Sequence, residues 1–169
     1  MSRYETLGRI EVRDAGDDDV GAIQRVARTT WHHTYRYSIP EGVRAQFLDH
    51  AYAADTLRRR IASNVFLVAL QDGNIVGFSD FRTLSQTEAE LAAIYVLPGM
   101  QARGIGGRLL AAGISHFATG TRFVLRVERD NALALRFYEA HGFQRSGELT
   151  EELFGYEFHD VEMVLDPGF

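Results

Sequence analysis

Cysteine is absent from all 169 residues of the chain. Its absence excludes disulfide bonds, a thiol nucleophile and a zinc ion held by thiolates. The six histidines are scattered, and His32 and His33, the only close pair, point to different sides of a helix because they are adjacent. We therefore expect no metal site in this protein.

Long apolar runs are also missing. No run approaches the roughly 18 residues that a membrane-spanning helix needs. The N-terminal segment MSRYETLGRI lacks the apolar core of a signal peptide. We therefore expect a cytoplasmic protein that makes no contact with a membrane.

The overall balance of residue types is that of a soluble domain. Hydrophobic residues make up 46% and charged residues 24% of the chain, which is ordinary for a globular protein. The 23 acidic side chains outnumber the 18 basic ones, for a net charge of -5. This excess argues against non-specific binding of nucleic acid and suits a cationic small substrate. The length and the lack of repeats or linkers predict a single domain over residues 1–169.

The most informative stretch runs from Leu91 to Ala111. Leu91 to Leu97 is a continuous apolar run, which predicts a strand buried on both faces, and Pro98 ends it. A Gly-rich loop, Gln101 to Gly107, then leads into a helix. The unpaired N–H groups at a helix start attract anions, and glycine lets an anion approach the backbone. With the charge of Arg103 beside it, the loop is a candidate phosphate cradle.

The loop departs from two other phosphate-binding patterns. A Walker loop needs Lys and then Ser or Thr directly after its last glycine, but Ile105 follows Gly104. A dinucleotide-binding fingerprint needs a third glycine where Leu109 stands, although Glu128 and Asp130 lie near the place of its acidic residue. A dinucleotide-binding protein therefore stays an alternative, as does a purely structural Gly-rich turn.

A second pattern spans the predicted helix from Asn131 to Gly142. Residues seven positions apart lie within about 20° of one helix face and about 10 Å apart along the axis. Asn131 and Tyr138 therefore share a face, with Ala134 between them. A polar cap, a small residue and a phenol in line could bind along an extended ligand. The alternative is a core helix with an N-cap asparagine and a buried aromatic ring.

The remaining periodicity predicts a mixed sheet with helices on both sides. The predicted strands are residues 10–13, 65–70, 75–81, 88–97, 122–127, 143–149 and 156–165, and the predicted helices are residues 20 to 35–37, 43–50, 55–63, 105 to 119–120 and 131–141. The helix between the strands at 88–97 and 122–127 predicts that these two strands are parallel. Arg58, Arg59 and Arg60 are expected to form a solvated helix face, with contact to an anionic cofactor as the alternative.

Together, the loop and the later helix resemble the GCN5-related N-acetyltransferases, the GNAT superfamily. Gln101-x-x-Gly104-x-Gly106, after Val96-Leu97-Pro98, is similar to motif A of that family. Residues 131–143, Asn-x-x-Ala-x-x-Phe-Tyr-x-x-x-Gly-Phe, match its motif B position for position. The resemblance covers residues 65–165. It implies an α+β fold in α/β/α layers, with a mixed, largely antiparallel central sheet whose central strands splay apart.

Members of this family transfer an acyl group, usually acetyl, from acyl-coenzyme A to an amine. The resemblance therefore implies an acyl-coenzyme A N-acyltransferase with acetyl-coenzyme A as its co-substrate. Backbone donors of the loop would hold the diphosphate, and the central strand would hold the pantetheine arm. The residues that the resemblance assigns to the co-substrate are Ile94, Tyr95, Val96, Gln101, Ala102, Arg103, Gly104, Ile105, Gly106, Gly107, Arg108, Asn131, Ala134, Phe137 and Tyr138.

Two residues are candidates for acid–base chemistry. An amine with a solution pKa of about 10 arrives protonated. Glu90, on the central strand, resembles the general-base glutamate of some family members, which acts through water. Alternatively, Glu88 and Glu90 only lie at the solvated mouth of the strand. By the resemblance, Tyr138 would protonate the departing thiolate; the alternative is that it only packs against the sulfur.

The predicted substrate residues lie mainly at the end of the first helix. Trp31 and Tyr35 stand where the family usually places acceptor-binding elements, and Phe78 and Glu90 complete the set. The N-terminal pattern and residues 155–165 look somewhat like PaiA-type acetyltransferases, which act on polyamines. A small-molecule amine is therefore the expected acceptor. A protein N-terminus or lysine is one alternative, and a coenzyme A-binding sensor without activity is another. Paired subunits are common in the family, so a homodimer is an open expectation.

Overall fold

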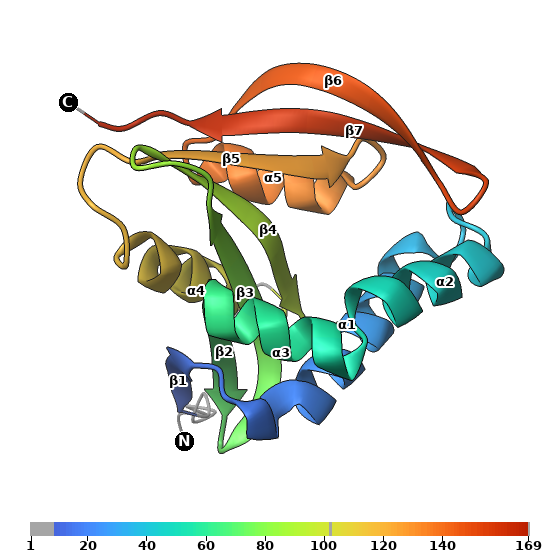
Figure 1. Ribbon diagram of the computed structural model, residues 1–169, viewed down its shortest axis with the longest axis horizontal. Coiled ribbons are helices and arrows are strands. Elements are labelled where there is room, and N and C mark those ends of the chain that lie inside the picture. The colour runs from blue at the N-terminus through green and yellow to red at the C-terminus, as the bar shows by residue number, and fades with distance from the viewer. Residues whose placement is uncertain (1–8, 102, 169) are drawn as a thin grey trace, which may run out of the picture.

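A seven-stranded sheet crosses the molecule in the order β1-β2-β3-β4-β5-β7-β6, as the computed structural model shows (Figure 1). The structure describes residues 9–101 and 103–168. The strands are β1 (Ile10–Asp14), β2 (Val65–Gln71), β3 (Asn74–Thr83), β4 (Glu88–Val96), β5 (Arg122–Glu128), β6 (Gln144–Leu153) and β7 (Tyr156–Leu165). The helices are α1 (Val20–Tyr35), α2 (Glu41–Ala51), α3 (Ala54–Ser63), α4 (Ile105–Ile114) and α5 (Ala132–Ala140), with a short 3₁₀ turn at Asp17–Asp19.

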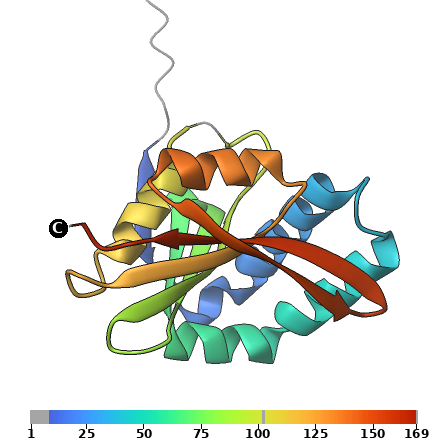
Figure 2. The ribbon, with the colours of Figure 1, turned by 90° about the horizontal axis from the view of Figure 1, so that it is seen from above.

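The helices cover both faces of this sheet (Figure 2). On one face, α1, α2 and α3 bury an apolar cluster that includes Ile23, Trp31 and Phe78. On the other face, α4 and α5 contribute Leu110 and Leu135 to a second cluster. Within the described residues, β4 and β5 are parallel and the other neighbouring pairs are antiparallel. The predicted α/β/α layers and the mixed, largely antiparallel sheet are confirmed.

β4 carries one extra residue, Ala92, in its pairing with β3. Asp80 pairs with Ala93 and the next residue of β3, Phe81, pairs with Leu91, so Ala92 is left out of the register. This β-bulge reverses which way the following side chains point: Leu91 packs in the α4–α5 layer, whereas Ala93 packs in the α1–α3 layer. Ala92 itself is exposed. The prediction of a strand buried on both faces is therefore wrong at this position.

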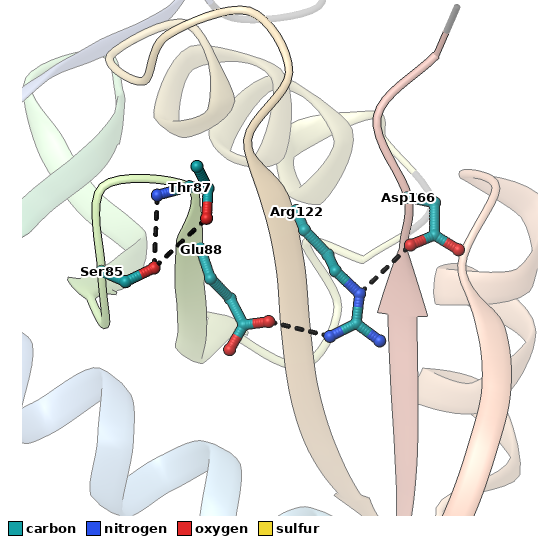
Figure 3. A network of polar contacts seen from close by, with 5 residues as sticks. All are labelled: Ser85, Thr87, Glu88, Arg122 and Asp166. Carbon is teal, nitrogen blue, oxygen red and sulfur yellow. Dashed lines mark hydrogen bonds and ion pairs between the residues drawn. The ribbon is translucent and has the colours of Figure 1, made fainter.

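β4 and β5 pair only at their beginnings. Glu88 to Glu90 align with Arg122 to Val124, and beyond these residues the strands diverge (Figure 1). Arg122 helps to hold the two strands together at this short paired segment. Its Nη1 donates to Glu88 at 2.8 Å, and its Nε donates to Asp166 at 3.1 Å (Figure 3). The strands are thus held together at one end and open at the other, which is the splayed arrangement that the resemblance implies.

Two element ends lie four or more residues from their predicted positions. α4 ends at Ile114 rather than near residue 120, because the hydroxyl of Ser115 donates to the carbonyl of Ala112 at 2.6 Å and competes with helix continuation. β6 continues to Leu153 rather than residue 149. A tight turn at residues 154–155, with φ angles of 54° and 72°, joins it to β7. The first turn residue is phenylalanine, which does not signal such a turn in a sequence.

Arg60 also departs from its prediction. Its Nε donates to the buried carboxylate of Asp80 at 2.9 Å, whereas Arg58 and Arg59 are exposed. The expectation of a solvated face is therefore right for the first two arginines and wrong for the third. α3 turns Arg60 toward β3, where the opposite charge of Asp80 lies.

Candidate active site

A cavity of about 820 Å³ occupies the space where β4 and β5 diverge. Its walls come from residues 91–96 of β4, the loop before α4, the end of β5 with α5, and the second half of α1. β4 has no ladder with β5 beyond Glu90, so backbone N–H and C=O groups on that edge are available to a ligand. The cavity therefore brings together the two motifs that the sequence singled out.

The Gly-rich loop forms part of the cavity wall. Gly104 is the N-cap of α4 and has a φ of 77°, a left-handed conformation that favours glycine. A Cβ on Gly106 would stand 3.2 Å from the Phe137 ring, and a Cβ on Gly107 would stand 3.2 Å from Nε2 of His141. The side chains of Phe137 and His141 therefore pack closely against the loop at these two glycines. At Gly104 a Cβ would meet no atom of the described residues within 4 Å, so the helix N-terminus is open there to a diphosphate group.

Most residues assigned to the co-substrate lie together in this cavity. Those that line it are Ile94, Tyr95, Val96, Gln101, Gly104, Gly106, Gly107, Asn131, Ala134, Phe137 and Tyr138. Among the described members of the set, three do not line it. Ile105 is buried in the core, Arg103 is exposed, and Arg108 donates from Nη1 to the carbonyl of Ile10 at 2.8 Å. Successive residues at a helix start point in different directions, so Ile105 and Arg108 do not share the direction of the glycines that line the cavity. Ala102 lies outside the described residues.

Asn131 links α5 to α1. Its Oδ1 accepts the backbone N–H of Ala134 at 3.2 Å and caps α5, as the N-cap interpretation predicts. Its Nδ2 donates to the hydroxyl of Tyr35 at 3.3 Å. Asn131 and Tyr138 both line the cavity, which agrees with the prediction that they share a helix face. A direct contact between Asn131 and the co-substrate stays a prediction.

Tyr138 places a phenol at the cavity. The residue is 8% exposed and its ring packs against Phe143, with the ring centroids 5.6 Å apart. Burial, with a smaller contribution from Tyr95, raises the pKa of the Tyr138 hydroxyl. The phenol therefore stays protonated at neutral pH, which is the state that a proton donor to a leaving thiolate needs.

The predicted substrate residues are divided by the structure. Trp31 and Tyr35 line the cavity, and the indole N–H of Trp31 donates to the Tyr95 hydroxyl at 3.0 Å. Phe78 is fully buried. Glu90 lies in the paired part of β4, where it accepts from Nη2 of Arg82 at 2.8 Å. Neither of these two is among the described residues that line the cavity.

Polar residues that the motifs missed form another part of the wall. This polar wall consists of Thr30, His33, Thr34, Ser38, Arg126, Glu128, Asp130 and Arg136. Oγ1 of Thr30 is buried and has no hydrogen-bond partner within the described part of the chain. The available signals were weak: polar side chains at helical spacing on α1, and a carboxylate at the end of β5. Neither signal identifies a cavity until the two segments are brought together by folding.

The glycine loop, the splayed strands β4 and β5 and helix α5 all lie in the part of the chain that matches a known protein family. The model of the Acetyltransferase (GNAT) family matches residues 25–143, a range that includes the walls of the cavity. The chain belongs to this family. It is an acyl-coenzyme A N-acyltransferase, specifically a GNAT-type N-acetyltransferase, as the two sequence motifs imply.

Three curated relatives of this GNAT enzyme differ in what their names say. The uncharacterized N-acetyltransferase YuaI of Bacillus subtilis is 28% identical over 159 residues, which cover 90% of each chain. Spermidine N(1)-acetyltransferase of Thermoplasma acidophilum is 27% identical over 143 residues, covering 80% of this chain and 88% of its own. N-alpha-acetyltransferase RimI of Mycobacterium tuberculosis is 38% identical over 104 residues, covering 59% of this chain and 65% of its own.

Solved structures confirm the GNAT fold. The PaiA N-acetyltransferase from Thermoplasma acidophilum, crystallised in complex with coenzyme A, matches with a TM-score of 0.80 and 25% identity, covering 94% of this chain and 99% of that one. A coenzyme A complex of a neighbour agrees with the co-substrate that the motifs imply. In residues 9–101 and 103–168, no helix is long and apolar enough to cross a membrane. Across the same residues, no three His, Asp or Glu side chains gather as metal ligands would.

Two loop glycines allow a test of the prediction that the glycine loop binds the diphosphate. Gly99 and Gly104 have φ angles of 85° and 77°, and a Cβ on either meets no atom of the described part of the chain within 4 Å. Only Gly104 lines the cavity. Gly99→Ala and Gly104→Ala should therefore cost similar stability, about 1 kcal/mol each from the left-handed conformation. Calorimetry should show that only Gly104→Ala weakens acetyl-coenzyme A binding, by about tenfold. Equal affinities of the two variants for acetyl-coenzyme A would contradict binding of the diphosphate by the loop.

Proposed function

We propose that the enzyme transfers an acetyl group from acetyl-coenzyme A to a primary amine of a small molecule, polyamine-like or amino-acid-like, by direct attack in a ternary complex. One observation carries this proposal: a single cavity joins the glycine loop to the polar wall through the gap between β4 and β5. Both substrates can therefore meet at the open edge of β4. No covalent acyl-enzyme is needed, and the chain has no cysteine to form one at a thiol.

The chain's own groups supply the steps of this reaction. Backbone N–H groups at the start of α4, from Gly104 to Gly107, hold the diphosphate. The unpaired edge of β4 past Glu90 offers donors to the amides of the pantetheine arm, and one of these N–H groups can polarise the thioester carbonyl as an oxyanion donor. Tyr138 gives its proton to the departing thiolate.

The preference for a cationic small molecule rests on charge and on relatives. The chain carries a net charge of -5, and Glu128 and Asp130 bring two carboxylates to a cavity that Arg126 and Arg136 also line. Carboxylates favour an ammonium group over a neutral or acidic acceptor. The name of the spermidine N(1)-acetyltransferase relative points to the same class of acceptor.

A panel of acceptors tests the proposal. We expect thiol release from acetyl-coenzyme A with spermidine and other di- and polyamines, and weak or no release with peptides that have a free N-terminus or a lysine. All 18 basic side chains of the enzyme are arginines, so self-acetylation on lysine cannot obscure the assay. Turnover of peptides alone would favour a protein acetyltransferase, as the RimI relative suggests. Tight binding of coenzyme A without turnover of any amine would favour a sensor. Either result overturns the proposal.

A further inference from the structure

Glu128 and Asp130 are two carboxylates that line the cavity, whereas the predicted base Glu90 is not among its lining residues. Glu128 is the last residue of β5, beyond the residues of β5 that pair with β4, and it lines the cavity. We infer that Glu128 is the general base that takes the proton from the acceptor's ammonium group. This inference rests on the proposed function, because it requires an amine that arrives protonated.

The carboxylate of Glu128 is held in place by the backbone. Its Oε2 accepts the N–H of Asp130 at 2.6 Å, which leaves Oε1 free to accept a proton or an ammonium group. No ion pair within residues 9–101 and 103–168 includes Glu128. Glu90, by contrast, is bound to Arg82 at 2.8 Å. Glu90 is therefore already occupied by a guanidinium group and does not line the cavity, so Glu128 is the better placed of the two to meet an acceptor there.

The surroundings of Glu128 raise the pKa of its carboxyl group, which suits a general base. Partial burial raises its pKa above the ordinary value for glutamate, and the charges of Asp130 and Asp160 raise it further. The N–H of Asp130 and the charge of Arg129 act in the opposite direction. A higher pKa brings the base closer to the pKa of the amine, which favours proton transfer.

The opposite part of the polar wall points to a ligand in the same cavity. Thr30 lines the cavity, and its buried hydroxyl oxygen has no hydrogen-bond partner among residues 9–101 and 103–168. A buried hydroxyl without a partner is costly, and an N–H group of an acceptor would satisfy it. Thr30 on α1 and Glu128 on β5 thus provide two polar groups for one amine.

The proposed step balances in atoms and electrons. The ammonium nitrogen gives one proton to Glu128, and its lone pair forms the N–C bond to the thioester carbonyl carbon. The C–S bond then breaks, and the thiolate receives a proton from Tyr138. The nitrogen's second proton replaces the one that Tyr138 gave. The net proton released to solvent leaves from Glu128, and no group is oxidised or reduced.

Two variants and a matched control test this inference. In Glu128→Gln the side-chain oxygen can still accept the N–H of Asp130, so the fold should persist, and kcat for a polyamine should fall by about 100-fold or more. Glu128→Asp keeps a carboxylate but withdraws it, and should lie between the wild type and Glu128→Gln. Glu152→Gln removes an exposed β6 carboxylate outside the cavity and should leave kcat unchanged. Calorimetric binding of acetyl-coenzyme A and the unfolding midpoint should be the same in all four proteins.

The pH profile separates a base from a binding group. The kcat of the wild type should rise with pH as Glu128 loses its proton, and this rise should be missing from the pH profile of Glu128→Gln. A raised KM with unchanged kcat and an unchanged pH profile would show that Glu128 only binds the acceptor, and would overturn the inference. Loss of kcat in Glu90→Gln, with full activity of Glu128→Gln, would overturn it in favour of the sequence prediction. If the wild type acetylates no amine, the proposed function itself fails; the other outcomes affect Glu128 alone.

Discussion

Tyr138→Phe should lower kcat for acetyl transfer by about 100-fold or more, while the affinity for acetyl-coenzyme A stays unchanged. The change removes only the phenol oxygen, which we propose as the proton donor to the thiolate. The ring itself packs against Phe137 and Phe143, with centroids 5.2 Å and 5.6 Å away, and phenylalanine keeps those contacts. Steady-state kinetics and a calorimetric titration on the same preparation measure the two quantities.

A second tyrosine provides the control for this change. Tyr37 is 90% exposed and does not line the cavity, so Tyr37→Phe should leave kcat at the wild-type value. If Tyr138→Phe also keeps its kcat, Tyr138 only packs against the sulfur and the thiolate leaves without its help. If acetyl-coenzyme A binding falls together with kcat, the hydroxyl acts in binding rather than in proton transfer.

Arg60→Met should reduce the free energy of unfolding by about 3–5 kcal/mol. Arg60 donates from Nε to Asp80 at 2.9 Å and from Nη1 to the carbonyl of Ala51 at 2.6 Å. Asp80 is 1% exposed, and besides Arg60 it accepts from Asn64 at 2.8 Å. Removing the guanidinium therefore leaves a buried carboxylate without its compensating charge. Urea unfolding at neutral pH measures the loss.

The pH dependence of the variant gives a second reading of the same interaction. Burial raises the pKa of Asp80, and Arg60 partly opposes that rise. Without Arg60 the pKa of Asp80 should rise further, and a raised folded-state pKa means that stability is lost as the pH increases through it. The deficit of Arg60→Met should therefore shrink as the pH is lowered and Asp80 becomes protonated.

The neighbouring arginine controls for the loss of a charge from α3. Arg59 is exposed, and in the described part of the chain its side chain forms a hydrogen bond to Thr56 alone, with Nη2 3.3 Å from the hydroxyl oxygen. Arg59→Met should change the free energy of unfolding by less than about 0.5 kcal/mol. The double variant Arg60→Met/Asp80→Leu should be more stable than Arg60→Met alone, because it removes the unpaired charge. A loss of less than about 1 kcal/mol in Arg60→Met would contradict the buried-pair account.

The order of elements and the co-substrate side of the site could be predicted from sequence because their signals are local. The turn at Asp72-Gly73 has positive φ at both residues, as its type requires, and Gly142 ends α5 with a φ of 93°. The loop glycines and the residues of α5 that line the cavity lie within two short motifs. Patterns of this kind lie within short segments of the chain and do not depend on contacts with residues far away in the sequence.

The remaining features depend on contacts between distant segments. The bulge at Ala92 arises from pairing with β3 and cannot be seen in β4 alone. Arg60 looks like its exposed neighbours until β3 supplies Asp80. The polar wall joins α1 to the end of β5, and the hydrogen bond between Tyr35 and Asn131 spans 96 positions of the chain. These are long-range effects of folding, which is why the sequence alone points to Glu90 as the base and not to Glu128, the base that we infer.

A calorimetric titration of the wild-type protein with acetyl-coenzyme A, repeated with NAD, tests the central claim most directly. The claim is that the start of α4 holds a diphosphate and directs an acyl group into the gap between β4 and β5. We expect one acetyl-coenzyme A to bind per chain, competed by coenzyme A, and no heat from NAD. Binding of NAD without binding of acetyl-coenzyme A would contradict the account.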